Sequence, residues 1–203
     1  MRPLRLPVTL AWIGILLASL WLAGCQPAPS PFKGTDIRHE NFGRRLELTD
    51  HTGQRRSLAD FRGQVVVLFF GYTHCPDVCP TTLSDVAMAM RLLPPEQAKR
   101  VRALFVSVDE RDTPETLAQY VPYFHPDFLG LYGTPEEIAA AAKEFRIVYR
   151  KHFEPGASDY LIDHTAGSYV IDAQGRLRLF LPFAQPPEDI AHDLALLLAE
   201  IGS

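Results

Sequence analysis

The sequence predicts a three-layer α/β sandwich, in which helices cover both faces of a central sheet. Residues 65–70 form an unbroken run of valine, leucine and phenylalanine, which is typical of a central strand buried on both faces. Helical and extended patterns then alternate along the chain until a hairpin pattern and a last helix close it. This alternation indicates an α/β fold rather than an all-α or an all-β fold.

The first 24 residues are predicted to be a signal peptide outside the fold. Arg2 and Arg5 accompany an apolar run that reaches about residue 23, and Leu22-Ala23-Gly24-Cys25 resembles the lipobox of bacterial lipoproteins. That resemblance implies lipidation of Cys25, which would anchor the protein to a membrane at its periplasmic or another extracytoplasmic face. An uncleaved transmembrane anchor is the alternative, because the run approaches the ~18 apolar residues that a span needs.

Residues 25–40 are expected to be a tether, because they are rich in Pro, Ala and Ser and show no periodicity. Residues 41–203 are then one domain, which is long enough to bury a core. Without Arg2 and Arg5, 18 of the 20 basic residues remain against 24 acidic residues, a net charge of −6. Since no basic run interrupts this acidic balance, nucleic acid is not an expected partner.

The domain is expected to begin with a hairpin, since residues 44–49 and 54–58 alternate in polarity around a turn that contains glycine. The buried strand follows, and a loop carries Cys75 and Cys79 into a helix that begins near Pro80. The remaining elements are predicted in this order: a strand at 102–108, a helix from 114, a short strand at 128–132, a helix from 135 to about 145, an extended segment at 147–149, a hairpin of 167–171 and 177–183, and a helix at 187–201.

Two of these helices have clear start signals, because Thr113 and Thr134 are N-cap residues that precede proline at the first helical position. Strand, helix, strand and helix, followed by a hairpin and a last helix, is the order of a thioredoxin-like fold. In that fold, Cys75 and Cys79 lie at the positive end of a helix dipole, where thiolates are stabilised.

The spacing of the cysteines and the residue expected opposite them favour metal binding. Oxidoreductases of this fold separate their cysteines by two residues and place a cis-proline opposite them, before the hairpin. Here three residues separate Cys75 from Cys79, and the loop before the hairpin reads Asp163-His164-Thr165 without a proline. Two thiolates and the imidazole of His164 make a soft site with few ligands, which suits copper.

Three motifs together resemble the Sco/SenC family, membrane-tethered copper-binding proteins with a thioredoxin-like fold that help to assemble cytochrome c oxidase. The motifs are Gly71-Tyr72-Thr73-His74-Cys75-Pro76-Asp77-Val78-Cys79-Pro80, Ser107-Val108-Asp109 with Arg111-Asp112-Thr113-Pro114, and Asp163-His164-Thr165-Ala166. The first is long and specific, and the three span nearly the whole globular region. Glu110 and Ala173 depart from the family, which commonly has proline at both positions.

The resemblance implies that Cys75, Cys79 and His164 hold copper, as Cu(I), Cu(II) or both. It also implies a metallochaperone that delivers copper to the dinuclear copper site in subunit II of cytochrome c oxidase. Other copper carriers, thiol reductants and, through the N-terminal lipid, the membrane are the further partners expected. Asp109 is expected to support the site, His74 to be exposed or adjacent to the ligands, and residues 110–112 to form a solvated turn.

Three other interpretations involve the same cysteines. The pair could form a structural disulfide, which is common in small domains outside the cytoplasm. It could instead form a reversible disulfide in a thiol–disulfide reductase that prepares the cysteines of the oxidase site, so an enzymatic role stays open. A peroxiredoxin would need Thr or Ser three residues before its reactive cysteine, but Tyr72 and Pro76 occupy these positions. The third interpretation is therefore disfavoured.

Overall fold

The computed structural model describes residues 30–153, 156 and 159–201. The chain divides into two units, and the second, Phe32–Ser203, contains every helix and strand discussed below. The predicted signal peptide and Cys25 lie outside the described residues. Of the helices in the described part, none combines the length and apolar character that a membrane span requires.

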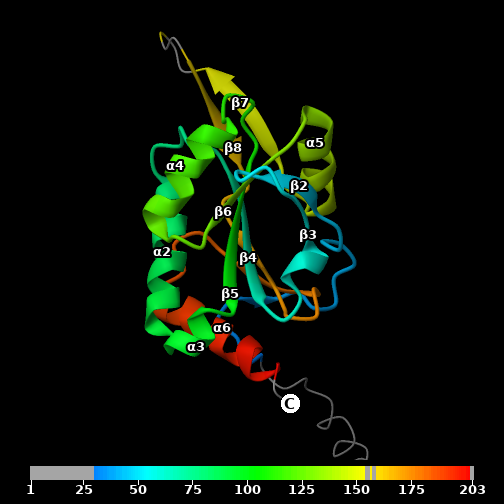
Figure 1. The fold of residues 1–203 in the computed structure, drawn as a ribbon, viewed down its shortest axis with the longest axis vertical. Helices are drawn as coiled ribbons and strands as arrows, with labels where there is room; N and C mark the ends of the chain where they lie inside the picture. Colours follow the sequence, from blue (N-terminus) through cyan, green and yellow to red (C-terminus); the bar gives the residue numbers. More distant parts are fainter. Residues whose placement is uncertain (1–29, 154–155, 157–158, 202–203) are drawn as a thin grey trace, which may run out of the picture. The chain divides into compact units, whose positions relative to one another are not determined.

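An eight-stranded sheet forms the centre of the folded unit, with the strand order β1-β10-β9-β4-β5-β6-β2-β3 (Figure 1). Its strands are β1 (Thr35–Asp36), β2 (Glu47–Asp50), β3 (Arg55–Ser57), β4 (Val65–Gly71), β5 (Val101–Ser107), β6 (Leu129–Tyr132), β9 (Ser168–Ile171) and β10 (Leu177–Leu181). β4, β5 and β6 are parallel, and the flanking pairs are antiparallel. All seven residues of β4 are buried, as its apolar run predicts.

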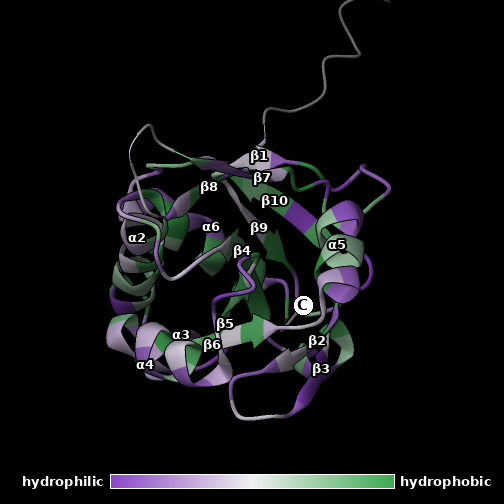
Figure 2. Cartoon of the chain, turned by 90° about the horizontal axis from the view of Figure 1, so that it is seen from above, coloured by the Kyte–Doolittle hydropathy of each residue, from purple (hydrophilic) through white to green (hydrophobic). Residues whose placement is uncertain are grey.

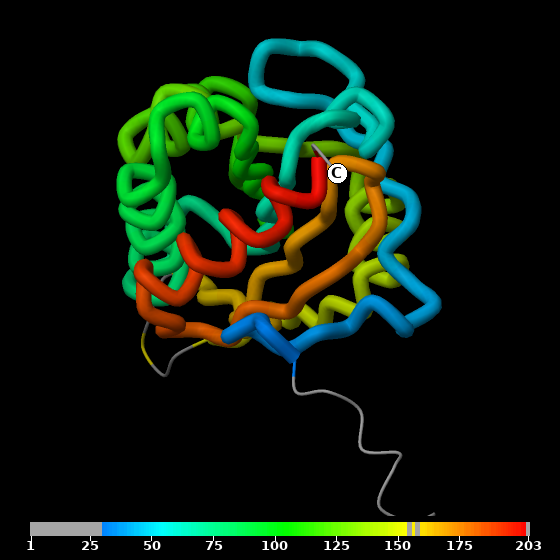
Figure 3. Tube along the Cα trace, turned by 90° about the horizontal axis from the view of Figure 1, so that it is seen from below, coloured from blue at the N-terminus to red at the C-terminus, as the bar shows by residue number. Residues whose placement is uncertain are grey.

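Helices cover both faces of this sheet. α2 (Val78–Leu92), α4 (Pro114–Phe124) and α6 (Pro187–Ala199) lie on one face, and α5 (Pro135–Glu144) lies on the other (Figure 2). A tube view shows α6 crossing beside α2 (Figure 3), and α6 also contacts β4. Two short helices, η1 (Leu58–Phe61) and α3 (Pro95–Ala98), complete the set. The predicted three-layer α/β sandwich is confirmed.

The two predicted helix starts are also confirmed. Thr113 and Thr134 are N-caps whose hydroxyls accept hydrogen bonds from the backbone amides three residues later, and proline follows each at the first helical position. α2, in contrast, begins at Val78 rather than near Pro80. Cys79 therefore lies within the first helical turn, where proline is still tolerated because the amides there have no intrahelical partner.

The domain begins earlier than the predicted boundary at residue 41. Within the predicted tether, β1 pairs antiparallel with β10. Just before it, the backbone amides of Lys33 and Gly34 donate hydrogen bonds to the buried carboxylate of Asp193, at 2.8 and 2.7 Å. The assignment of residues 25–40 to a tether is thus wrong for its last part. A two-residue strand held by a distant carboxylate leaves no periodicity in the sequence.

A second, two-stranded sheet is the main element that the sequence did not predict. β7 (Tyr149–Phe153) pairs antiparallel with β8 (Tyr160–His164), with Tyr149 opposite His164. The extended segment at 147–149 is thus the beginning of a longer strand. His164, expected in a loop, ends a strand instead. Polar and charged residues dominate β7, and no residue of β7 is buried, so its sequence lacks the apolar alternation of a strand that packs on a core.

Candidate metal centre

The two cysteines are placed by the end of β4 and the beginning of α2. Cys79 is completely buried, whereas Cys75 is partly exposed, and both are free thiols. The backbone amide of Cys79 donates a hydrogen bond to Sγ of Cys75 over 3.4 Å. Amides at a helix N-terminus are available for this purpose because they have no partner within the helix. The predicted location of the pair at a helix N-terminus is therefore observed.

Gly71 makes the close approach of the buried thiol possible. A Cβ atom at this position would lie 2.7 Å from Sγ of Cys79 and 2.9 Å from the ring of Phe105. Such distances are well inside van der Waals contact, so a side chain here would displace the sulfur or the strand. The glycine directly after the apolar run 65–70 is the sequence signal for this constraint.

His164 approaches the cysteines from β8. Its Nε2 lies 3.4 Å from Sγ of Cys79, and one donor atom from each of Cys75, Cys79 and His164 lies within 4.8 Å of the other two. The structure thus brings together the three residues that the sequence analysis selected. Two sulfurs and one imidazole nitrogen form a group that could hold a metal ion, and this donor set suits a soft metal such as copper.

The imidazole has a defined orientation. Nδ1 of His164 lies 3.1 Å from the carbonyl oxygen of Thr165, and since a carbonyl only accepts, Nδ1 carries the proton in this contact. Nε2 then faces the sulfurs, in the orientation from which it can bind a metal once it carries no proton. The rings of Phe69 and Tyr72 pack edge-on against the imidazole, with centroid distances of 5.7 and 6.0 Å.

The two thiols differ in their acidity. A hydrogen bond from the Cys79 side chain lowers the pKa of Cys75 to about 4, although burial acts to raise it. Contacts with His164 and with backbone amides also lower the pKa of Cys75. Burial raises the pKa of Cys79, and the neighbouring Cys75 raises it further. The metal-free site thus contains one thiolate and one thiol. A metal that binds both sulfurs displaces the proton of Cys79.

Cys75 and His164 both line an open depression of about 270 Å³. His152 of β7, Leu161 of β8, Pro76 and Val78 also line it. Cys79 is not among the lining residues. A molecule that approaches the site through this depression therefore reaches Cys75 and His164 before it reaches Cys79.

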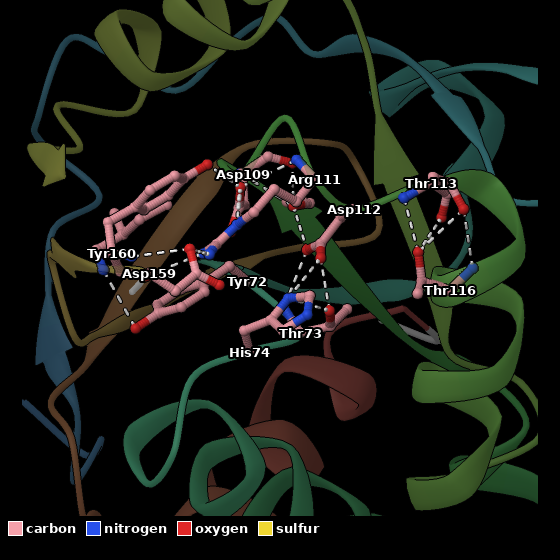
Figure 4. A network of polar contacts seen from close by, with 12 residues as sticks. Tyr72, Thr73, His74, Asp109, Arg111, Asp112, Thr113, Thr116, Asp159 and Tyr160 are labelled. Atoms are coloured by element: carbon pink, nitrogen blue, oxygen red, sulfur yellow. Dashed lines mark hydrogen bonds and ion pairs between the residues drawn. The ribbon is translucent and has the colours of Figure 1, made fainter. Parts of the chain in front are cut away.

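A buried carboxylate fixes the loop that precedes Cys75. Asp112 accepts hydrogen bonds from the amide and the hydroxyl of Thr73, at 2.9 and 2.5 Å, and from the hydroxyl of Ser107 at 2.6 Å (Figure 4). Nδ1 of His74 lies 3.6 Å from the same carboxylate, and the His74 side chain is half exposed. The expected position of His74, exposed and next to the ligands, is observed. The interpretation of residues 110–112 as a solvated turn holds for the exposed Glu110 but is wrong for Asp112, which is buried and hydrogen-bonded.

Asp109 is buried as well and belongs to the same strand end. It accepts hydrogen bonds from Arg111 and from the hydroxyl of Tyr160, the latter at 2.9 Å (Figure 4). His74, Asp109 and Asp112 also offer donor atoms within 4.8 Å of one another. Because arginine, tyrosine, serine and threonine already occupy these carboxylates, the cysteine–histidine group is the better candidate for a metal.

Comparisons with known proteins show the family of this chain. The SCO1/SenC family model matches residues 34–199. The mitochondrial "Protein SCO2 homolog" of Bos taurus is 39% identical over 160 residues, which cover 78% of this chain and 60% of that protein. The chain therefore spans less than two thirds of the length of this relative.

Two solved structures share both sequence and fold with this chain. ScoI of Bradyrhizobium japonicum, solved with copper bound, is 39% identical with a TM-score of 0.71 and covers 78% of this chain and 100% of its own. Apo Sco1 of Thermus thermophilus is 40% identical with a TM-score of 0.67 and covers 87% of this chain and 98% of its own. The predicted thioredoxin-like fold is confirmed by these likenesses.

Proposed function

The chain belongs to the SCO1/SenC family, and we propose that it is a copper metallochaperone that assists assembly of the dinuclear copper site of cytochrome c oxidase. The observation that carries this proposal is the convergence of Cys75, Cys79 and His164 within 4.8 Å. The copper-bound state of the related ScoI from Bradyrhizobium japonicum supports copper as the metal. Subunit II of the oxidase is the proposed recipient.

The three ligands would have different tasks in handling this cargo. Cys79 is a buried, fixed donor, because β4 and α2 enclose it. Cys75 lines the open depression and is the sulfur that an incoming ligand of a partner protein can contact first. His164 comes from a separate hairpin and supplies the nitrogen that Cu(II) favours, while the two sulfurs alone suit Cu(I). Copper could therefore leave stepwise, with the exposed ligands exchanged before the buried one.

Copper stoichiometry of the anaerobically reduced protein tests this proposal. The wild type should bind one copper ion, and Cys75→Ser or Cys79→Ser should each abolish tight binding, because serine is a hard and poorly acidic donor. His125→Ala is the matched control, since His125 is a partly buried histidine at the end of α4. Near wild-type Cu(I) affinity in either serine variant would contradict the assignment of the site.

We also propose that lipidation of Cys25 anchors this domain to a membrane, at the periplasmic or another extracytoplasmic face, with the start of the predicted tether as spacer. The Leu22-Ala23-Gly24-Cys25 sequence supports this. A Cys25→Ala variant should move from the membrane fraction to the soluble fraction only if lipid is the anchor. Retention in the membrane would instead favour the uncleaved transmembrane anchor.

A thiol–disulfide reductase is the second candidate, and the unequal exposure of the two thiols favours it. The exposed thiolate of Cys75 could attack a disulfide in the oxidase subunit to form a mixed disulfide, and Cys79 could then displace the second sulfur. The pair would end as a disulfide, and the target would gain two thiols. Other thiol reductants would then have to reduce the pair again.

An assay on an oxidised dithiol peptide tests the reductase candidate. The reduced wild type should release peptide thiols, and Cys79→Ser should stop at the mixed disulfide. If the peptide stays oxidised while copper binds stoichiometrically, the chaperone function stands alone.

A further inference from the structure

The β7–β8 hairpin that carries His164 lies outside the central sheet. Among the described residues, β7 pairs only with β8, and the exposed side chains of Val148 and Phe153 show that solvent surrounds much of this hairpin. The cysteines, in contrast, belong to the main fold, with Cys75 in the loop after β4 and Cys79 in α2. The distance from His164 to the sulfurs therefore depends on the side chains that tie the hairpin to the rest of the domain.

Arg111 makes the largest set of these contacts. Its Nη2 lies 2.5 Å from a carboxylate oxygen of Asp109, on the segment that follows β5, and also donates to the carbonyl oxygen of Tyr160 over 3.2 Å. Nη1 pairs with Asp159, just before β8, and the guanidinium lies 3.7 Å from the centre of the Tyr160 ring. Figure 4 shows Arg111 between Asp109 and the hairpin residues. One side chain thus joins the main fold to the beginning of β8.

The hairpin also makes a direct hydrogen bond to the carboxylate of Asp109. The hydroxyl of Tyr160 donates to Asp109 over 2.9 Å, so Asp109 is the common fixed point of both contacts. Further along β8, the amide of Ile162 donates to the hydroxyl of Tyr72 over 3.2 Å. Tyr160 begins this five-residue strand and His164 ends it. Since an extended strand has little freedom within so short a length, fixing its beginning and middle fixes its end.

We propose that Arg111 is a positioning residue for His164, and that the Asp109–Arg111–Tyr160 contacts form a latch that keeps the imidazole at the cysteine pair. This inference rests on the proposed copper site. With the latch closed, the site offers two sulfurs and a nitrogen. With the latch open, the hairpin carries His164 away and the two sulfurs remain. The latch thereby sets how strongly the site prefers Cu(II) relative to Cu(I).

Arg150 provides a matched control. It is also an arginine paired with an aspartate of the hairpin, since its Nη2 lies 3.5 Å from Asp163, but both side chains are exposed. This pair joins β7 to β8, and among the described residues Arg150 forms no hydrogen bond or ion pair with the main fold. Arg150→Ala therefore removes the same charge and the same side chain from the hairpin region without opening the latch. Exposed pairs of this kind contribute little to stability.

Parallel titrations with Cu(I) and Cu(II) test the latch. Arg111→Ala should weaken Cu(II) binding by about tenfold or more, as changes to residues that orient a metal-binding histidine do. Cu(I) binding should change by less than about threefold, because the thiolates suffice for that ion. The thiolate-to-Cu(II) charge-transfer bands should shift in this variant and not in Arg150→Ala. Equal losses for both ions, or an equal effect of Arg150→Ala, would overturn the proposal.

Arg111→Lys tests whether Arg111 acts through the geometry of its hydrogen bonds or only through its positive charge. Lysine keeps the positive charge but lacks the planar fork that bonds Asp109 and Tyr160 together. If Arg111 acts by position, the lysine variant should show most of the Cu(II) loss. Wild-type behaviour of Arg111→Lys would mean that the charge alone matters, and the latch would be refuted. Should Arg111→Ala fail to fold, Tyr160→Phe opens one latch contact by the loss of a single hydroxyl.

Hydrogen exchange of the copper-free protein tests the latch without any metal. Amides of β7 and β8 should exchange faster in Arg111→Ala than in Arg150→Ala, while amides of β4 and α2 should stay as protected as in the wild type. Uniform loss of protection would assign Arg111 to general stability and contradict the latch. If the wild type bound no copper, the proposed function would fail, and this exchange comparison would still decide whether the latch exists.

Discussion

The cysteine segment and the β7–β8 hairpin meet at one site but differ in how the fold holds them. Cys79 belongs to the first turn of α2 and is buried against the completely buried strand β4. Asp112 fixes the loop before Cys75. His164 lies at the end of β8, a strand outside the central sheet in which only Ile162 is buried. The protein thus combines two donors on segments of the main fold with one donor whose position depends on a few contacts between the hairpin and the main fold.

This difference indicates that the two sulfurs and the imidazole can be controlled separately. Local opening of a protein needs least free energy where few apolar groups are buried, which describes the hairpin and not β4. An opened hairpin leaves a dithiol that suits Cu(I) or disulfide chemistry, and a closed hairpin adds the nitrogen that suits Cu(II). The four predictions below test this separation, beginning with the largest effect.

Oxidation of the cysteine pair should remove copper binding altogether. Sγ of Cys75 and Sγ of Cys79 lie within 4.8 Å of each other, and bridging needs only a modest approach of the two side chains. A metal needs both sulfurs as free thiolates, so the disulfide and bound copper exclude each other. Copper analysis of the oxidised and re-reduced protein measures this effect. Stoichiometric, equally tight copper in the oxidised protein would place the site elsewhere.

His164→Ala should weaken Cu(II) binding much more than Cu(I) binding. Two thiolates can hold Cu(I) alone, whereas Cu(II) prefers four donors and loses an imidazole in this variant. We expect a loss of about a hundredfold or more for Cu(II), at the upper end of what changes around a metal ligand cause. Thiol reactivity should persist, because the cysteines belong to another segment.

His152→Ala is the control for this experiment, since His152 lines the same depression from β7. It should leave both affinities near those of the wild type. Equal losses of Cu(I) and Cu(II) in His164→Ala would show that this histidine shapes the fold instead of binding metal. An unchanged Cu(II) spectrum would transfer the ligand role to another residue, with His74 as the first to test.

Gly71→Ala should damage the cysteine segment and spare the hairpin. The added methyl would lie 2.7 Å from Sγ of Cys79, and overpacking of a core costs about 1–3 kcal/mol of stability. The free energy of unfolding in urea measures the loss. In a Cys79→Ala background the same substitution should cost less, because the sulfur is gone. Equal costs in both backgrounds would show that the strain arises at Phe105 or Phe69 instead.

The part of the site that the core fixes could be predicted from the sequence. The apolar run 65–70 and the helix start beside the two cysteines have strong local signals, although α2 begins two residues before Pro80 and includes Cys79. His164 was selected from its expected place opposite the cysteines and from the family resemblance. The structure brings it to the sulfurs, although on a strand that the sequence analysis did not predict.

The contacts that hold the hairpin could not be predicted, because they join residues far apart in the chain. Glu110, Arg111 and Asp112 are consecutive charged residues after Asp109 and look like a solvated turn. The burial of Asp109 and Asp112 depends on partners about 40 to 50 positions away, Thr73 before them and Tyr160 after them. Such partners cannot be inferred from a local pattern of charges. The pairing of β7 with β8 likewise cannot be inferred from the polar sequence of β7.

Acid should open the hairpin before it disturbs the cysteine segment. Burial disfavours the charged form of Asp109, but hydrogen bonds from Arg111 and Tyr160 outweigh it and lower the pKa of Asp109 below its usual value. A carboxyl whose pKa is lowered by folding stabilises the folded state fully above its unfolded pKa of about 3.9, and this contribution is lost as the pH falls through the folded pKa. Below about pH 4, β8 amides should therefore lose protection relative to β4 amides.

In Asp109→Asn the hairpin should already be less protected at pH 7 and should respond less to acid. Asp36→Asn removes another carboxyl whose pKa is lowered, through Arg38, and should leave the hairpin unchanged. The effect is expected to be the smallest of the four, because the bond from Ile162 to Tyr72 remains. Parallel acid dependence of β8 and β4 in the wild type would show that the two regions open together.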